Sequence, residues 1–71
     1  MQAFIDNGFT LEYPDYWAKD FGNVRVTIAN GESINGYMWE VQVMEDDACI
    51  LATEGFDSPQ DALNMVQREF N

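Results

Sequence analysis

Residues 24–43 read VRVTIANGESINGYMWEVQV and carry the strongest sign of a β-sheet in the chain. Apolar and polar residues alternate over 24–28 and again over 37–43, a pattern typical of strands with one buried face. Two Asn-Gly pairs lie between these runs, and either suits the positive φ angles of a type I′ turn. We therefore predict an antiparallel hairpin in which Glu40 points away from the buried face.

A third strand is expected after this hairpin, and a helix is expected at the end of the chain. Residues 48–53 are almost continuously apolar, so we predict a strand that is central or covered on both faces. Ser58 can cap a helix that begins at Pro59, and Asp61 places an acid in the first turn. Apolar residues then recur at helical spacing, which predicts a helix over about 59–70 that packs on the sheet.

The N-terminal third is predicted to hold one more strand and a short helix or loop. Residues 9–13 alternate and follow a turn at residues 6–8, so they form the first strand. Residues 16–21 fit one helical turn, closed by Gly22. The predicted fold is a single α+β domain over residues 1–71, with a three- to four-stranded antiparallel sheet and a C-terminal helix packed on one face.

The charge of the chain restricts its partners more than its fold. Thirteen acidic residues stand against three basic ones in 71 residues, with no histidine and a net charge of −10. Such a field repels nucleic acid and anionic membranes and attracts basic protein surfaces. The chain is 46% hydrophobic and 14% aromatic, so it has the material for a core that disordered acidic tails lack.

Several classes of chemistry are disfavoured by composition. Without histidine, the commonest general base near neutral pH is missing, so we expect that the protein is not an enzyme. The remaining catalytic alternative is a carboxylate-based enzyme, which needs a cleft. The acids at residues 6–8 and 45–47 lack the spacing of a calcium-binding loop, so no metal or cofactor is expected. Direct nucleic-acid binding is disfavoured because Lys19, Arg25 and Arg68 do not cluster in the sequence.

The expected compartment is the cytoplasm. Cys49 is the only cysteine, which excludes an intrachain disulfide and suggests a reducing environment. Residues 1–4 carry no basic n-region of a signal peptide. No segment approaches the ~20 apolar residues needed to span a bilayer, so we expect no membrane partner.

The acidic surplus itself is the best candidate for a functional device. Carboxylates on a rigid surface can occupy the places of phosphates and accept charge-assisted hydrogen bonds from Lys and Arg. Aromatic residues alternate with acids over residues 13–21, and Tyr is common among residues that dominate binding energy. We predict partner contacts at seven residues: Asp15, Tyr16, Asp20, Glu40, Glu45, Asp46 and Asp47.

In size, charge and expected order of elements, the whole chain resembles the small acidic α+β inhibitors of phages and mobile elements, such as anti-CRISPR proteins and other DNA mimics. No shared motif carries this resemblance, so no site residue is transferred from that class. The resemblance implies a monomer in the host bacterial cytoplasm. It implies a partner that is a basic nucleic-acid-binding protein, such as a CRISPR effector or another defence protein, blocked from engaging DNA or RNA.

A different class of function fits the same composition. The chain can be a small structural or accessory module that forms homodimers through a sheet edge or exposed aromatic residues. In that case the acidic surface serves only solubility.

Self-repulsion among the carboxylates predicts that salt stabilises the fold. The melting temperature should rise between low and physiological salt, because screening shortens the Debye length to ~8 Å. Thermal unfolding followed by circular dichroism measures this directly. An unchanged melting temperature would contradict the prediction.

Overall fold

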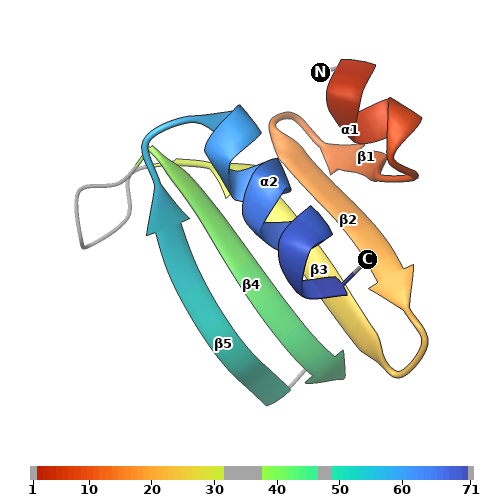
Figure 1. Ribbon diagram of the computed structural model, residues 1–71. Helices are drawn as coiled ribbons and strands as arrows, with labels where there is room; N and C mark the ends of the chain where they lie inside the picture. Colours follow the sequence, from red (N-terminus) through yellow and green to blue (C-terminus); the bar gives the residue numbers. More distant parts are fainter. Residues whose placement is uncertain (1, 32–37, 47–48, 71) are drawn as a thin grey trace.

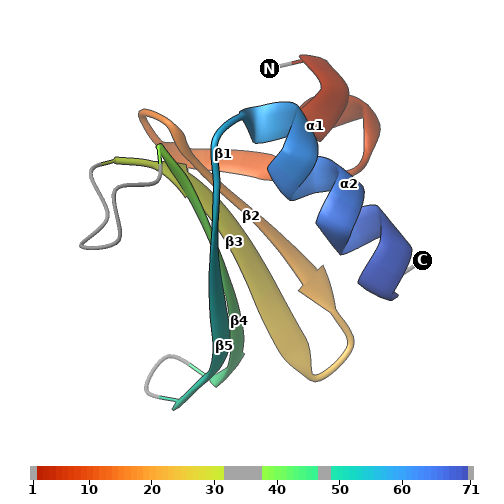
Figure 2. The same ribbon diagram turned by 60° about the vertical axis from the view of Figure 1, so that its left-hand side comes forward.

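The computed structural model describes residues 2–31, 38–46 and 49–70, which form one antiparallel sheet with two helices on the same face (Figures 1 and 2). The elements are, in chain order, α1 (Gln2–Asp6), β1 (Thr10–Tyr13), β2 (Tyr16–Phe21), β3 (Val24–Asn30), β4 (Trp39–Asp46), β5 (Cys49–Phe56) and α2 (Pro59–Phe70). Neighbouring strands in the sheet are consecutive in the chain, from β1 to β5. The α+β class, the antiparallel sheet and the C-terminal helix are confirmed, whereas the sheet has five strands instead of three to four.

The segment 16–21 accounts for the extra strand, because it forms β2 and not a helical turn. Phe21 pairs with Val24, so Gly22 and Asn23 are the two residues of a hairpin loop. Gly22 has a φ of 62°, while Asn23 has no positive φ, and this combination defines a type II′ turn. Gly22 therefore joins two strands. The Gly-Asn pair between two runs of strand-forming residues was the sequence signal for it.

The turn predicted at residues 6–8 is the C-terminal cap of α1. The N–H of Phe9 donates to the carbonyl of Phe4 at 2.9 Å, and the N–H of Gly8 donates to the carbonyl of Ile5 at 3.0 Å. These two bonds form a Schellman motif, in which Gly8 adopts the required left-handed conformation with a φ of 86°. The motif brings Phe9 onto Phe4, with ring centroids 5.8 Å apart.

Helix α2 begins and ends where the sequence predicted. The hydroxyl of Ser58 accepts a hydrogen bond from the N–H of Asp61 at 3.1 Å, as expected of an N-cap. Pro59 is the first helical residue, and Arg68 lies in the last turn, where a cation complements the helix dipole. Local capping chemistry therefore accounts for the start of this helix.

The core lies between the two helices and the sheet face that they cover, and the opposite face has no helix over it (Figure 2). Alternate residues of β3 and β4 meet on the covered face, where Ile28 pairs with Val41. The large side chains with almost no exposure come from both helices and these two strands: Phe4, Val26, Ile28, Val41, Leu63 and Val66. Full burial of each such side chain contributes about 1.5–3 kcal/mol to folding.

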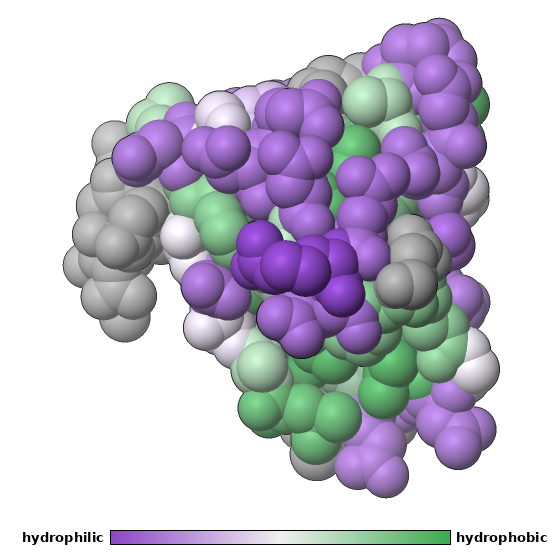
Figure 3. Space-filling model, viewed as in Figure 1, coloured by the Kyte–Doolittle hydropathy of each residue, from purple (hydrophilic) through white to green (hydrophobic). Residues whose placement is uncertain are grey.

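The position of the last strand corrects a prediction. Residues 48–53 were expected to form a central or doubly covered strand, but β5 is an edge strand that pairs only with β4 within the described ranges. Ile50 and Leu51 are more than half exposed. Figure 3 shows apolar surface over the lower ends of β4 and β5, beside α2. The described side chains of this apolar run, at residues 50–53, are therefore surface and not core.

Phe4 should be the residue that holds α1 on the sheet. Its ring is fully buried, with centroids 5.2 Å from Trp17 and 6.1 Å from Trp39. We expect Phe4→Ala to lower the free energy of unfolding by about 3 kcal/mol, through lost burial and a cavity. Ile5→Ala is the matched control on the same helix, where the side chain is 55% exposed, and should change it by less than about 0.5 kcal/mol. Urea denaturation measures both, and equal losses would contradict this role for Phe4.

Candidate functional site

The candidate site is the sheet face that the helices leave uncovered, together with its two ends. The register places Tyr16, Ala29 and Glu40 in one row across β2, β3 and β4. Small side chains form the middle of this face, where Ala18 and Thr27 are buried beneath their longer neighbours. Polar and charged side chains therefore form the outer layer of this face.

An ion-pair cluster crosses the face from β1 to β3. The Arg25 guanidinium donates to Asp20 at 3.1 Å and to Glu12, and the Arg25 side chain is 30% exposed. Hydrogen bonding to Glu12 raises the pKa of Arg25 above its ordinary value, against the opposing effect of partial burial. The cluster lines a polar hollow of about 330 Å³. Arg25 therefore stays charged at every accessible pH and neutralises carboxylates of its own chain.

The Lys19 side chain also bonds within the fold. The Lys19 ammonium donates to the backbone carbonyl of Asn7 at 2.7 Å and lies 4.7 Å from the centre of the Phe21 ring. The amide group of Asn7 in turn donates to the Ala3 carbonyl and accepts from Gln67, so this site joins α1, α2 and β2. The charge of Lys19 is thus directed at the helices and not at the uncovered face.

The third cation lies on the exposed side of α2. Arg68 has a side chain that is 70% exposed and lies 3.9 Å from Glu69, the long end of ion-pair distances. None of the three cations of the chain lies near Glu40 among the described contacts. The Glu40 carboxylate accepts one hydrogen bond, from the amide of Gln42 at 3.1 Å, and keeps its negative charge uncompensated.

The predicted contact residues fall into two groups at opposite ends of the strands. The upper end in Figure 1 carries Asp15, Tyr16 and Glu40, from the β1–β2 turn and the start of β4. The lower end carries Asp20, Glu45 and Asp46, from the ends of β2 and β4. Four residues of strand separate Tyr16 from Asp20, which is about 13 Å. Asp47 lies outside the described residues, and so does the side chain of Asp46.

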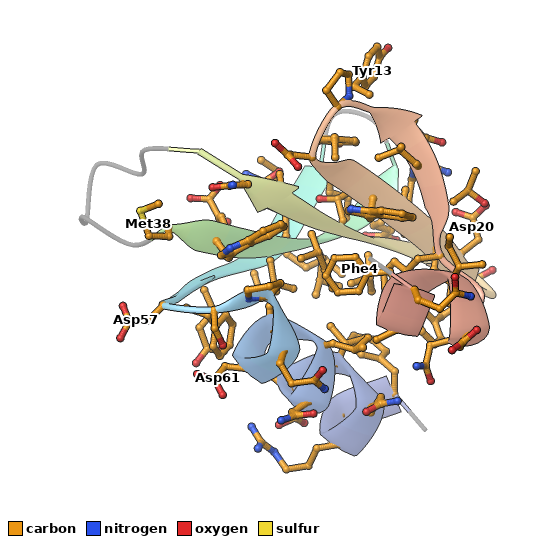
Figure 4. The ribbon with its side chains drawn as sticks, turned by 90° about the horizontal axis from the view of Figure 1, so that it is seen from above. Phe4, Tyr13, Asp20, Met38, Asp57 and Asp61 are labelled. Atoms are coloured by element: carbon orange, nitrogen blue, oxygen red, sulfur yellow. The ribbon has the colours of Figure 1, made fainter. Side chains whose placement is uncertain are left out.

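Two tyrosines mark the upper end. Tyr13 and Tyr16 flank the two-residue turn between β1 and β2, and their rings meet edge to face with centroids 5.7 Å apart. Asp15 in this turn has a φ of 58°, and its carbonyl accepts a hydrogen bond from Asn30 at 2.9 Å. The Tyr13 side chain is 68% exposed and projects from the turn (Figure 4). A turn that is hydrogen-bonded to the end of β3 therefore presents an aromatic pair beside an acid.

Sequence reasoning missed the pairing of Glu12 and Asp20 with Arg25, and it included Asp20 in the contact set as if it were unpaired. Asp20 lies directly opposite Arg25 because the hairpin loop consists of Gly22 and Asn23. Recognition of that two-residue loop in the sequence predicts this pair. The contact with Glu12 follows only from the tertiary structure, since it spans β2.

Comparisons with known proteins assign no role to any residue of this chain. The scan against protein-family models, the search of curated proteins and the search of solved structures each find no match to this chain. Over the described ranges, no three side chains of the kinds that bind metals come close enough to share an ion. Neither α1 nor α2 has the length and apolar character that a membrane-crossing helix needs. The geometry and charge of this chain are therefore the only guides to its function.

The two arginines should differ in their effect on stability. Arg25→Ala removes two ion pairs, uncovers Ala18 and leaves two carboxylates unpaired, so we expect a loss of about 1 kcal/mol in the free energy of unfolding. Arg68→Ala makes the same change of net charge without a short ion pair, and should cost less than about 0.5 kcal/mol. Urea denaturation at fixed salt measures both. Equal losses would show that net charge, and not the cluster, determines the effect.

Proposed function

We propose that this protein is a non-catalytic inhibitor that binds the basic surface of a nucleic-acid-binding protein and blocks its access to DNA or RNA. A CRISPR effector or another defence protein in a bacterial cytoplasm is the proposed partner. The inhibitor acts as a monomer. The contacts come from the uncovered face and its two ends, with Asp15, Tyr16 and Glu40 at the upper end.

One observation carries the proposal: two of the three cationic side chains are bonded within the fold. Arg25 is bonded to two carboxylates, and Lys19 is bonded to a backbone carbonyl under the helices. The remaining negative charge therefore has little internal compensation. The net charge of −10 is carried by a domain with extents of only 30, 27 and 24 Å, so a surface that binds phosphates through Lys and Arg meets a strongly negative field here.

The aromatic pair supplies what charge alone lacks. Exposed carboxylates steer association, but screened surface charges contribute little to the lifetime of a complex. Tyr13 and Tyr16 are held on this hydrogen-bonded turn and offer apolar area at low entropic cost. The upper end thus combines an anchor with the charges of Asp15 and Glu40.

The rival function, an accessory module that pairs with a second copy, is favoured by one observation. The outer edge of β5 has no strand partner among the described residues. A net charge of −10 on each copy opposes such pairing. Size-exclusion chromatography with light scattering separates the two functions, since the proposal requires a monomer and the rival a dimer.

Binding should weaken steeply with salt, and it should be competitive with nucleic acid. The immobilised chain is used to capture proteins from bacterial lysates at about 50 and about 500 mM salt, and each captured protein is then purified. We expect basic nucleic-acid-binding proteins whose affinity for the chain falls at least roughly tenfold at the higher salt. Labelled duplex DNA and the chain should displace one another in a fluorescence assay. Partners that hold DNA unchanged in the presence of saturating chain would contradict the proposal.

Charge-reversal variants locate the contact. Asp15→Lys with Glu40→Lys tests the upper end, and Asp46→Lys with Asp47→Lys tests the lower end. Asp6→Lys with Asp61→Lys is the control, because it makes the same change of net charge at exposed positions of the two helices, which cover the other face of the sheet. We expect at least one of the test variants to bind roughly tenfold more weakly than the control, with an unchanged melting curve. Equal affinity of all three would exclude these contacts.

A further inference from the structure

The outer edge of β5 is open to another strand. Ladder pairing with β4 is regular from Ala52 to Phe56, and it shifts register near Leu51, where β5 carries an extra residue. The regular part spans about 13 Å of strand. No proline or lysine, the residues that commonly protect such an edge, occurs in β5. The backbone groups on this side are therefore free to pair with an extended chain.

A groove runs beside this edge. It has a volume of about 350 Å³ and lies between the C-terminal half of α2 and the last two strands. Its walls are mainly apolar: Val41 and Val43 of β4, Ala52 of β5, and Met65 and Phe70 of α2. The groove and the edge are continuous, because Ala52 belongs to both. A strand added to β5 therefore places alternate side chains beside the groove.

Two carboxylates lie in this otherwise apolar groove. Glu54 points to the same side as Ala52 and Phe56, and its side chain has no hydrogen-bond or ion-pair partner in the described part of the chain. Glu69 reaches the groove from α2 and has only the long contact to Arg68. The side of β5 that faces the groove thus reads apolar, acidic, apolar at successive alternate positions.

The acidic position in this pattern distinguishes between two possible occupants of the β5 edge: a second copy of the chain and a basic segment of another protein. A second copy of the chain brings another β5 with its own Glu54 and another net charge of −10, so like charges meet at the edge. A basic segment brings a cation to the same place. Directly opposite residues of paired strands lie about 4.5–5.5 Å apart at Cβ, which is within reach of a lysine or arginine head group to Glu54.

We infer that the β5 edge and its groove bind an extended basic segment of a partner protein as a sixth strand. The segment carries a lysine or arginine opposite Glu54 and apolar residues two positions before and after it, opposite Ala52 and Phe56. The main-chain hydrogen bonds supply affinity, and the alternate side chains supply specificity, as in other cases of strand addition. This inference rests on the proposed function, because in both the partner is a basic protein.

The test uses capped seven-residue peptides and isotope-labelled full chain. The probe reads Thr-Val-Thr-Lys-Thr-Val-Thr, and the comparison peptide has glutamate in place of lysine. Saturable amide shifts should appear from Ala52 to Phe56 and along the groove, with a dissociation constant in the millimolar range or tighter. The lysine peptide should bind roughly tenfold more tightly than the glutamate peptide. N-methylation of alternate backbone nitrogens on the edge that pairs should abolish binding, because it removes the donors.

Charge exchange at one position gives the sharpest outcome. The Glu54→Lys chain should reverse the preference and bind the glutamate peptide more tightly, which a merely destabilised chain does not do. Asp6→Lys is the control, because it makes the same change of net charge at an exposed position of α1, away from β5, and it should keep the preference for lysine. Equal binding of the two peptides, shifts located elsewhere, or concentration-dependent shifts of β5 in the free chain would overturn the inference. The last result would assign the edge to a second copy.

The two proposals can fail separately. Peptide binding at β5 without any competition against nucleic acid would retain this inference and reject the proposed function. Competition that the Glu54→Lys chain retains in full, together with no peptide binding, would retain the proposed function and reject the strand addition.

Discussion

Burial of the β3–β4 face beneath α2 and Phe4 is the interaction on which the remaining structure depends. A domain of 71 residues buries only about 60% of the surface its unfolded chain exposes, so this single layer must supply most of the stability. Ile28 and Val41 meet at its centre with almost no exposure. Because the layer has no room for charge, every acidic side chain in the described ranges lies at its margin, on the uncovered face or on the outside of a helix.

Two of the three cations also serve the stability of this small domain. Lys19 fastens the helices to β2, and Arg25 binds two carboxylates across the uncovered face, so both stabilise the fold. Each is then less effective at reducing the outward field. The fold and the negative surface are therefore linked: the contacts of Lys19 and Arg25 hold the chain together, and neither cation lies beside Glu40.

The exposed apolar run in β5 lies at a sheet edge, where unprotected strands of two copies can pair. A register shift near Leu51 distorts one end of the edge, and Glu54 places a charge in the regular part. Both are devices that edge strands use against indiscriminate pairing. Repulsion between copies adds to them, and it acts only on acidic partners. Under the proposed strand addition, these features disfavour a second copy of the chain and favour a segment of opposite charge.

Local rules gave correct predictions wherever one segment contains the whole signal. Ser58 and Pro59 define the start of α2 through capping, and the alternation on either side of residues 30–36 predicts the β3–β4 hairpin. The strand at residues 16–21 was missed although Gly22 and Asn23 marked its hairpin loop. The edge position of β5 was not predicted, because a continuous apolar run has the same pattern in a central strand and in an edge strand. The neighbours of β5, the contact of Arg25 with Glu12 across β2 and the separation of the acids into two ends depend on strand order and register. These are long-range properties, since they arise only when residues distant in sequence pair, and no single segment contains them.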